Sequence, residues 1–367
     1  GIWGSPMGII NACDPQAAAE DGGLLGGIIA ESMRPDATVG TMIEAAFRWA
    51  RVLPNPDWAP LPTLGDAFST RLERALVASR ADAAWAGWGF VAERPEFVDL
   101  CQRLGLTFIG PPASAMRLLG DKVSAKRLAA QVGVPVTPWG GAAADSAETA
   151  RLQAQRLGFP VVIKAAAGIG GRAIRKVTSA AELPDAFEAA RQEALKTFGH
   201  GAVFVERWLE GSRHLEVQIV ADHHGTTWAL DLRGATVQRR HQKVVEESPA
   251  PGVPLDVDRA MRAAAVRLCR AAGLENLGAV EFLYEPATRD FHFMEVNPWL
   301  QVEHPVTELT TGIDLAMLQI HLARGGLLRG DPPPCTGHAV EVRITVEDAE
   351  RGFTPTPGAV RVLRVPT

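Results

Sequence analysis

Two acidic residues on adjacent predicted strands could together hold a divalent cation. The segments Val280–Leu283 and Phe293–Asn297 alternate apolar and polar residues, and a hairpin-like connection centred near residue 288 would join them. That register places Glu281 opposite Glu295, with Cβ atoms ~4.5–5.5 Å apart, and puts Asn297 on the same face as Glu295. Hard oxygen ligands suit Mg²⁺ held together with substrate phosphates. A solvated polar face is the alternative, but the interleaved apolar residues favour a half-buried metal site.

A lysine followed by a glycine-rich turn forms a second candidate site. Lys164 ends the predicted strand Val161–Lys164, and Gly168, Gly170 and Gly171 follow it. Glycines let backbone N–H groups converge on phosphate oxygens, although a ligand-free hairpin would have the same composition. The turn is not a P-loop, because no Gly-Lys-Ser/Thr opens a helix. Lysine is scarce, which favours a role beyond surface charge for each lysine; the six among 37 basic residues are Lys122, Lys126, Lys164, Lys176, Lys196 and Lys243.

A glutamate just beyond the second acidic strand could act as a general base. The string Gln301-Val302-Glu303-His304-Pro305 brings Glu303 close to the predicted metal, where His304 could orient it. Further upstream, residues 238–252 concentrate basic, amide and acidic groups without a helical apolar face. An exposed charged loop is the alternative interpretation of that segment.

These residues need a mixed α/β framework to position them. Strands at Ala81–Trp85 and Thr107–Ile109 alternate with helices, which predicts a parallel sheet. Ser179 and Glu182 form a capping box that would open a helix reaching Thr197. Beyond residue 210 the chain is rich in strands. The expected helices are Ala67–Ala78, Pro95–Leu104, two within Ala113–Gly133, and Asp256–Ala272. Further expected strands are Arg172–Val177, Ala202–Leu209, His214–Ala221, Thr226–Leu232, Ala279–Glu285 and Phe291–Asn297. The segment Pro135–Gly141 is typical of a linker.

Composition excludes several classes of protein. The 367 residues are 47% hydrophobic and 22% charged, values that exclude disorder. The net charge of −5 argues against a nucleic-acid partner, and no apolar run reaches the ~18 residues of a membrane span. Four dispersed cysteines read as reduced thiols, and residues 1–33 lack the basic start of a secretory signal. We therefore expect a cytoplasmic protein.

Longer strings in the chain resemble biotin carboxylase, an ATP-grasp enzyme found as a domain of biotin-dependent carboxylases. The strings are Gly120-Asp121-Lys122, Lys164 with its glycine turn, Gln238-Arg-Arg-His241-Gln-Lys243-Val-Val-Glu-Glu247, and Gln301-Val-Glu303-His-Pro-Val-Thr-Glu308. The resemblance runs from about Leu72 to Thr367 and does not extend over residues 1–65. Trp85-Ala-Gly-Trp-Gly89, Gly110-Pro-Pro112 and Asn297-Pro298 look most similar to multidomain acetyl-CoA carboxylases, which would imply a role in fatty acid biosynthesis.

The resemblance implies an ATP-grasp fold in three parts. These are a Rossmann-like N-terminal domain over residues 1–136, a small lid domain over 137–208, and a larger mixed-sheet domain over 209–367. The implied activity is carboxylation of carrier-bound biotin by bicarbonate through carboxyphosphate, driven by ATP. The implied ligands are ATP, Mg²⁺ or Mn²⁺, biotin and bicarbonate. The implied partners are a biotin carboxyl carrier domain and a carboxyltransferase domain or subunit, in a homo-oligomer.

The resemblance also assigns a role to each matching residue. Glu303 would deprotonate bicarbonate, which Lys243, Gln301 and Val302 would contact. Glu281, Glu295 and Asn297 would hold the metal. The ATP-binding set would be Lys122, Lys164, Gly168, Gly170, Gly171, Glu206, Leu209, His214, Gln238, His241 and Leu283, with Glu206 and Leu209 beside the adenine and His214 on the ribose.

Two departures from the family predict impaired catalysis. Trp299 replaces an arginine that contacts bicarbonate and biotin, and by strand period Trp299 should face the same site as Asn297. A second family arginine is expected from beyond Thr367, where this sequence ends. The alternatives are therefore another biotin-dependent carboxylase, acting on propionyl-CoA, pyruvate or urea, or an ATP-binding module with weakened catalysis.

Overall fold

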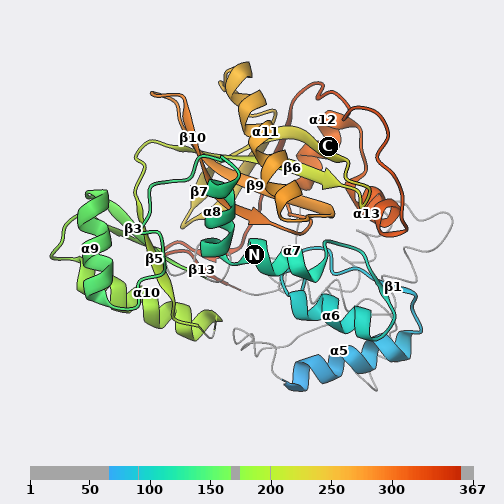
Figure 1. The fold of residues 1–367 in the computed structure, drawn as a ribbon, viewed down its shortest axis with the longest axis horizontal. Helices are drawn as coiled ribbons and strands as arrows, with labels where there is room; N and C mark the ends of the chain where they lie inside the picture. Colours follow the sequence, from blue (N-terminus) through green and yellow to red (C-terminus); the bar gives the residue numbers. More distant parts are fainter. Residues whose placement is uncertain (1–65, 90, 167–173, 199, 357–367) are drawn as a thin grey trace.

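The computed structural model describes residues 66–89, 91–166, 174–198 and 200–356, and its main feature is one large antiparallel sheet (Figure 1). Its six strands run in the order β10-β9-β6-β7-β8-β11. They are β6 (Arg213–Ala221), β7 (Thr227–Arg239), β8 (Gln242–Ser248), β9 (Asn276–Glu285), β10 (Asp290–Asn297) and β11 (Ala339–Val342). The strands expected beyond residue 210 are therefore present, and β7 is longer than its sequence pattern suggested.

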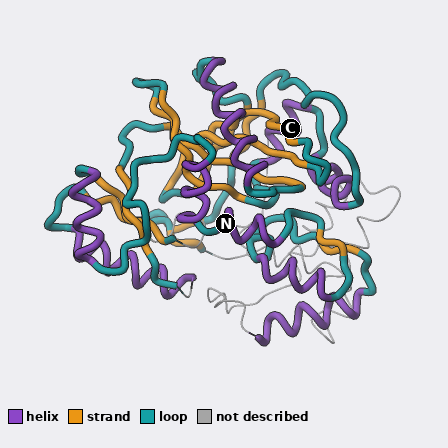
Figure 2. Tube along the Cα trace, in the orientation of Figure 1, coloured by secondary structure: helices purple, strands orange, loops and turns teal. Residues whose placement is uncertain are grey.

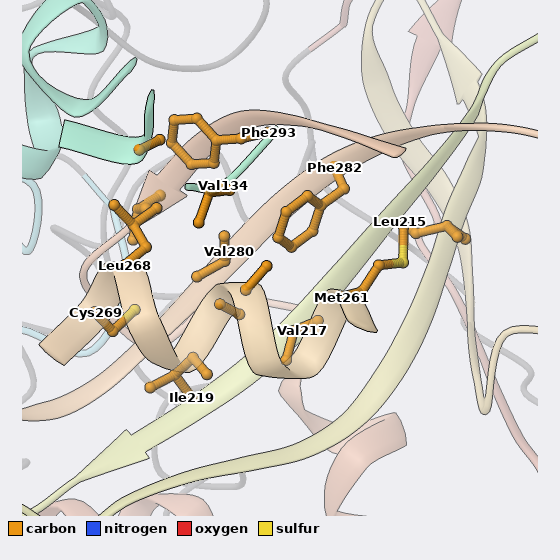
Figure 3. Packing of buried hydrophobic residues seen from close by; sticks show 14 of the residues in the cluster. Val134, Leu215, Val217, Ile219, Met261, Leu268, Cys269, Val280, Phe282 and Phe293 are labelled. Atoms are coloured by element: carbon orange, nitrogen blue, oxygen red, sulfur yellow. The ribbon is translucent and has the colours of Figure 1, made fainter. Parts of the chain in front are cut away.

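One face of this sheet packs against helices α8 (Lys122–Gln131) and α11 (Leu255–Ala271). The buried residues of α11 recur at helical spacing, including Val257, Met261, Ala264 and Leu268. They meet apolar residues of β6, β9 and β10, and Figure 3 shows this contact close by. Helices α12 (His304–Thr311) and α13 (Leu315–Ala323) belong to the opposite face, where β6, β7 and β9 contribute a second apolar cluster.

A three-stranded antiparallel sheet forms a separate small unit. Its order is β4-β3-β5, from β3 (Val161–Ala165), β4 (Arg175–Val177) and β5 (Val203–Arg207). Helices α9 (Ala147–Leu157) and α10 (Leu183–Phe198) cover it and share its apolar core, to one side of the molecule in Figure 2. The predicted capping box forms only in part: the Glu182 carboxylate accepts from the Thr178 backbone N–H, and α10 begins at Leu183 rather than near Ser179.

The first described region is a small parallel unit. Strands β1 (Ala83–Ala84) and β2 (Thr107–Phe108) pair in parallel, as predicted. Helices α5 (Asp66–Ser79), α6 (Pro95–Arg103) and α7 (Ala113–Gly120) accompany them, and a short β12–β13 hairpin (Glu347–Asp348 with Thr354–Pro355) lies near the C-terminus. The fold is of the mixed α/β class, as expected. The boundaries at residues 136 and 208 stay predictions, and residues 1–65 lie outside the described part.

No helix among the described residues is both long enough and apolar enough to cross a membrane.

Candidate active site

A β-bulge aims the two predicted metal-binding glutamates at each other. Glu295 pairs directly with Glu281, so the predicted register is confirmed. The pairing shifts between Phe293 and Glu295, which leaves Met294 as the extra residue. Phe293 and Val296 both pack into the core beneath α11, and strict alternation could not place both there. The bulge therefore turns Glu295 and Asn297 to the face that carries Glu281.

Lys243 is the hub of this polar face. Its Nζ lies 2.6 Å from Glu216 Oε2, 2.8 Å from Glu281 Oε1 and 2.5 Å from Glu303 Oε1. Burial alone would lower the pKa of Lys243, but these three carboxylates raise it well above its usual value. The ammonium is therefore held charged, and it gathers two predicted site residues with Glu216, which the sequence analysis missed.

Arg233 is a second buried cation that the sequence analysis missed. Its side chain is fully buried, and Nε donates to Glu216 Oε1 at 2.8 Å. One terminal nitrogen donates to Gln301 Oε1 at 2.7 Å, while Gln301 Nε2 donates to Glu281 Oε1 at 3.1 Å. Both ends of the Gln301 amide are thus fixed. A single arginine within the apolar alternation of β7 was the available signal.

Glu303 is the residue immediately before α12, and hydrogen bonds attach that helix to the large sheet. Thr307 and Thr310 donate to the two oxygens of buried Asp231 on β7, at 2.9 and 2.8 Å. Arg233 also donates to Thr307 Oγ1, at 3.0 Å. These contacts fix the start of α12 and hence the position of Glu303.

An arginine of this chain reaches Glu303 and corrects one expectation. Arg343, one residue beyond β11, donates to Glu303 Oε2 at 2.6 Å. Its Nε also lies 2.6 Å from Glu246 Oε1. The expected arginine from beyond Thr367 is therefore not needed to give Glu303 a guanidinium partner. The string Glu341-Val-Arg343 carried the signal, because alternate charges in a strand share one face.

His304 does not orient Glu303 as expected. Its Nδ1 lies 2.8 Å from the Gln301 carbonyl oxygen, to which it must donate. Burial lowers the pKa of His304, which favours the neutral ring. Lys243 and Arg343 hold the Glu303 carboxylate instead. His304 fixes the turn between Gln301 and the helix, in which Val302 lies.

A second histidine links the hairpin of β7 and β8 to the acidic pair. Gln238 Nε2 lies 2.7 Å from His214 Nδ1, and His214 Nε2 lies 2.7 Å from Glu281 Oε2. The amide can only donate there, so Nδ1 accepts and Nε2 carries the proton. Against the effect of burial, Lys243 and His214 lower the pKa of Glu281.

Lysines line the side of the site that faces the small sheet. Lys122, at the start of α8, lies 2.5 Å from Glu295 Oε2. Lys164, on β3, lies 2.7 Å from Glu206 Oε2 on β5. Lys126 of α8 pairs with the other oxygen of Glu206. The structure thus brings together two predicted phosphate ligands with Lys126, to which the sequence analysis gave no role.

The structure also locates the other described residues of the predicted ATP set. His241 occupies the exposed two-residue turn between β7 and β8 together with Arg240, both at positive φ. Partial desolvation of its ring, followed by the charge of Lys164, lowers the pKa of His241. Leu283 pairs with His214 in the large sheet, and Leu209 follows β5, both half-buried. Gly168, Gly170 and Gly171 lie outside the described residues.

Trp299 does not face the site, contrary to expectation. It packs with Leu72, Leu76 and Phe97 in the core of the first region and is only 8% exposed. Strand β10 ends at Asn297 and Pro298 follows, so strand alternation does not extend to residue 299. The departure from the family thus fills an apolar core rather than the polar site.

The donor set fits a divalent cation. Asn297 Oδ1 is buried without a hydrogen-bond partner, while its Nδ2 donates to Glu281 Oε1 at 2.6 Å. A free amide oxygen beside two carboxylates is the arrangement expected of hard-cation ligands. A second grouping of His214, Glu216 and Glu281 has ligand atoms within 4.8 Å of one another. Glu281 belongs to both groupings.

Comparison with known proteins agrees with this geometry. Residues 121–330 match the family described as carbamoyl-phosphate synthase L chain, ATP binding domain, and residues 68–116 match the biotin carboxylase N-terminal domain. The chain is 42% identical over 294 residues to the mitochondrial methylcrotonoyl-CoA carboxylase subunit alpha of Glycine max, covering 80% of the chain and 40% of that relative. It is 43% identical over 314 residues to pyruvate carboxylase 1 of Caenorhabditis elegans, covering 84% of the chain and 26% of that relative.

Solved structures of biotin carboxylases are also similar to this chain. A biotin carboxylase–ATP complex from Campylobacter jejuni has a TM-score of 0.76 at 38% identity, covering 79% of this chain and 65% of that one. The biotin carboxylase domain dimer of Hydrogenobacter thermophilus 2-oxoglutarate carboxylase, with MgADP, ADP and bicarbonate, has a TM-score of 0.78 at 35% identity, covering 82% and 66%. The chain spans well under half of the two curated relatives. It belongs to the carbamoyl-phosphate synthase L chain ATP-binding family and, within it, is a biotin carboxylase domain of the ATP-grasp fold.

Proposed function

We propose that this domain carboxylates carrier-bound biotin with bicarbonate at the expense of ATP. One observation supports this most: the Glu303 carboxylate is held by Arg343 and by Lys243, and Lys243 also binds Glu281, which is paired with Glu295. A positioned base, cations for a small anion and a cation site for MgATP thus lie together. The Campylobacter jejuni relative is named a biotin carboxylase, and the Glycine max and Caenorhabditis elegans relatives are named carboxylases.

The proposed chemistry begins with bicarbonate beside Lys243. Glu303 removes the bicarbonate proton, and the resulting oxygen attacks the γ-phosphorus of ATP, whose bond to the bridging oxygen of ADP breaks. The product is carboxyphosphate, which releases CO₂ and phosphate. CO₂ then bonds to N1 of biotin, whose proton passes to the phosphate. Gln301 and Val302 complete the proposed bicarbonate contacts.

The nucleotide would lie against the lysine side of the site. Lys122 and Lys164 would bind the phosphates, leaving Glu295 and Glu206 respectively. Leu209, Leu283 and the turn that carries His241 would border the base and ribose. The other residues of the proposed ATP-binding set are Glu206, His214, Gln238, Gly168, Gly170 and Gly171. Glu281, Glu295 and Asn297 would hold Mg²⁺ or Mn²⁺, which stabilises charge on the transferred phosphoryl group.

The narrower assignments are also proposals. The relatives named above favour methylcrotonoyl-CoA or pyruvate as the final acceptor over the acetyl-CoA that the sequence strings suggested. We further propose a carrier domain and a carboxyltransferase as partners, and a dimer like that of the 2-oxoglutarate carboxylase domain. The cytoplasm remains our proposed compartment, although the soybean relative is mitochondrial.

A second candidate function is an ATP-binding module with little biotin turnover. It rests on Trp299, which brings no guanidinium to the bicarbonate side. ATP hydrolysis should be measured with and without bicarbonate and free biotin. Hydrolysis that needs both supports the carboxylase; tight MgATP binding without such hydrolysis supports the module; and absence of MgATP binding contradicts both.

A further inference from the structure

Lys126 is a buried lysine that the proposed chemistry does not use. Its side chain is 1% exposed in the middle of α8, and its partners among the described residues are groups of the protein interior. Its Nζ pairs with Glu206 Oε1 and lies 3.4 Å from the Phe293 carbonyl oxygen. Burying an ammonium group is costly, so its presence needs an explanation.

Glu206 has two ammonium partners on two different elements. Lys126 comes from α8, and Lys164 comes from β3 of the small sheet. The Glu206 side chain is 2% exposed, so solvent cannot stabilise its charge. Burial raises the pKa of Glu206, but Lys126 and then Lys164 bring it down to about 2. The carboxylate is therefore ionised and depends on these cations.

Binding of a nucleotide changes this balance. When Lys164 turns to a phosphate, it weakens or gives up its contact with Glu206. A buried carboxylate left without a cation is strongly destabilised, whereas one that keeps a partner is not. Lys126 cannot follow Lys164 toward solvent, because it is enclosed beneath the sheet.

We propose that Lys126 is a positioning residue that neutralises Glu206 and thereby releases Lys164 to bind nucleotide phosphate. Without Lys126, Lys164 is the only ammonium paired with Glu206 and is retained there. This inference rests on the proposed binding of MgATP. It assigns a separate role to each lysine: Lys164 touches the ligand, and Lys126 sets the availability of Lys164.

The test measures the dissociation constant of MgATP by calorimetry for Lys126→Met, for Glu206→Gln and for the double variant Lys126→Met/Glu206→Gln. We expect the single variant to bind about 10–100-fold more weakly, the effect of losing one charge-assisted contact. The double variant has no buried carboxylate to retain Lys164, so Lys126→Met should weaken MgATP binding by less than about threefold in the Glu206→Gln background. A merely structural role for Lys126 should instead lower the affinity and the melting temperature together. Lys126→Arg keeps the cation and should bind within about threefold of wild type.

A matched control comes from the same small sheet. Lys176 on β4 pairs with Glu210 at 2.5 Å, but both side chains are exposed. Lys176→Met should therefore leave MgATP binding unchanged. Circular dichroism and thermal melting show which variants fold. If Lys126→Met does not fold, the comparison of the double variant with Glu206→Gln decides, because the double variant leaves no unpaired buried charge.

Two results would overturn the inference. These are unchanged MgATP affinity in folded Lys126→Met, or a folded double variant that binds MgATP more than about tenfold more weakly than Glu206→Gln. Failure of the wild-type chain to bind MgATP would instead contradict the proposed function, and the inference would fall with it.

Discussion

Cations and carboxylates are combined differently on the two sides of the site. In the lysine pocket, formed by Lys126, Lys164 and Glu206, two ammonium groups share one carboxylate. Around Lys243, three carboxylates share one ammonium, and Arg233 and Arg343 supply the remaining cations. The lysine pocket has positive charge to offer an incoming phosphate. The charges of Glu216, Glu281 and Glu303 are already compensated by those of Lys243, Arg233 and Arg343. We call this side of the site the balanced side.

The largest expected effect is at Glu303, on the balanced side. Glu303→Gln removes the base and leaves Lys243 and Arg343 in place. Bicarbonate-dependent ATP hydrolysis should fall by about 10²–10⁴-fold, the usual contribution of a positioned base. MgATP affinity should change little, because the lysine pocket is untouched. Glu285→Gln, on the same β9 strand as Glu281 but away from Lys243, is the control; an equal loss in both variants would contradict the assignment.

Variants of Trp299 test whether the balanced side lacks a cation. Because Trp299 packs in the first core, Trp299→Ala should destabilise the fold by about 3–5 kcal/mol. Trp299→Arg should also destabilise it, since it buries a charge among apolar residues. Denaturant titration measures both, with exposed Val77→Ala on α5 as the control. A stable Trp299→Arg variant with faster biotin turnover would show that this side chain does reach the site.

Loss of a phosphate ligand is the next largest effect. Lys122→Met and Lys164→Met should each weaken MgATP binding by about 10–150-fold, because a charge-assisted contact is worth ~1.5–3 kcal/mol. The Lys126 variant should differ from both, since only its loss can be rescued by Glu206→Gln. Unchanged dissociation constants in both variants would remove these lysines from the nucleotide site.

Glu295 stands where the two sides meet, because it pairs with Lys122 and faces Glu281. Glu295→Gln should weaken MgATP binding about tenfold and metal-free ATP binding much less, since it removes a hard ligand. Calorimetry with Mg²⁺ and with a chelator separates the two. Equal losses would mean that Glu295 holds Lys122 but no metal.

The smallest expected effect is on the pH dependence of folding stability, through Glu341 at the edge of the balanced side. Burial, followed by the charge of Glu246, raises the pKa of Glu341 to about 8 from its usual 4.5. The folded state thus binds a proton that the unfolded state has released, and stability falls as the pH rises from about 5 to 8. Glu341→Gln should match wild type at pH 5 and be more stable at pH 8.5 by roughly 1 kcal/mol, because partial exposure screens the charge. Equal melting temperatures at pH 8.5 would contradict this.

The sequence predicted those parts of the molecule that depend on local pattern. Alternation identified most strands, and the pairing of Glu281 with Glu295 followed from the hairpin between them. It did not reveal Arg233, Arg343 or Lys126, whose partners are brought close only by the strand order of the large sheet and the packing of α8. The direction of Trp299 was wrong because the pattern was extended past Pro298. Tertiary contacts, not local propensity, decide such positions.

The bulge at Met294 has a consequence for how this site can change. Before it, odd-numbered residues of β10 such as Phe293 lie in the core; after it, even-numbered Val296 does. The alternation of side chains between the two faces of β10 therefore shifts by one residue at Met294. Deleting Met294 would therefore remove the bulge but keep Glu295 opposite Glu281 and Val296 under α11, because Phe293–Phe282 and Glu295–Glu281 would become consecutive pairs. Pairing Met294 in a regular ladder, by contrast, would turn Glu295 into the core beneath α11 and Val296 toward the lysines, so the bulge itself, and not the length of the hairpin between β9 and β10, sets the chemistry of this face.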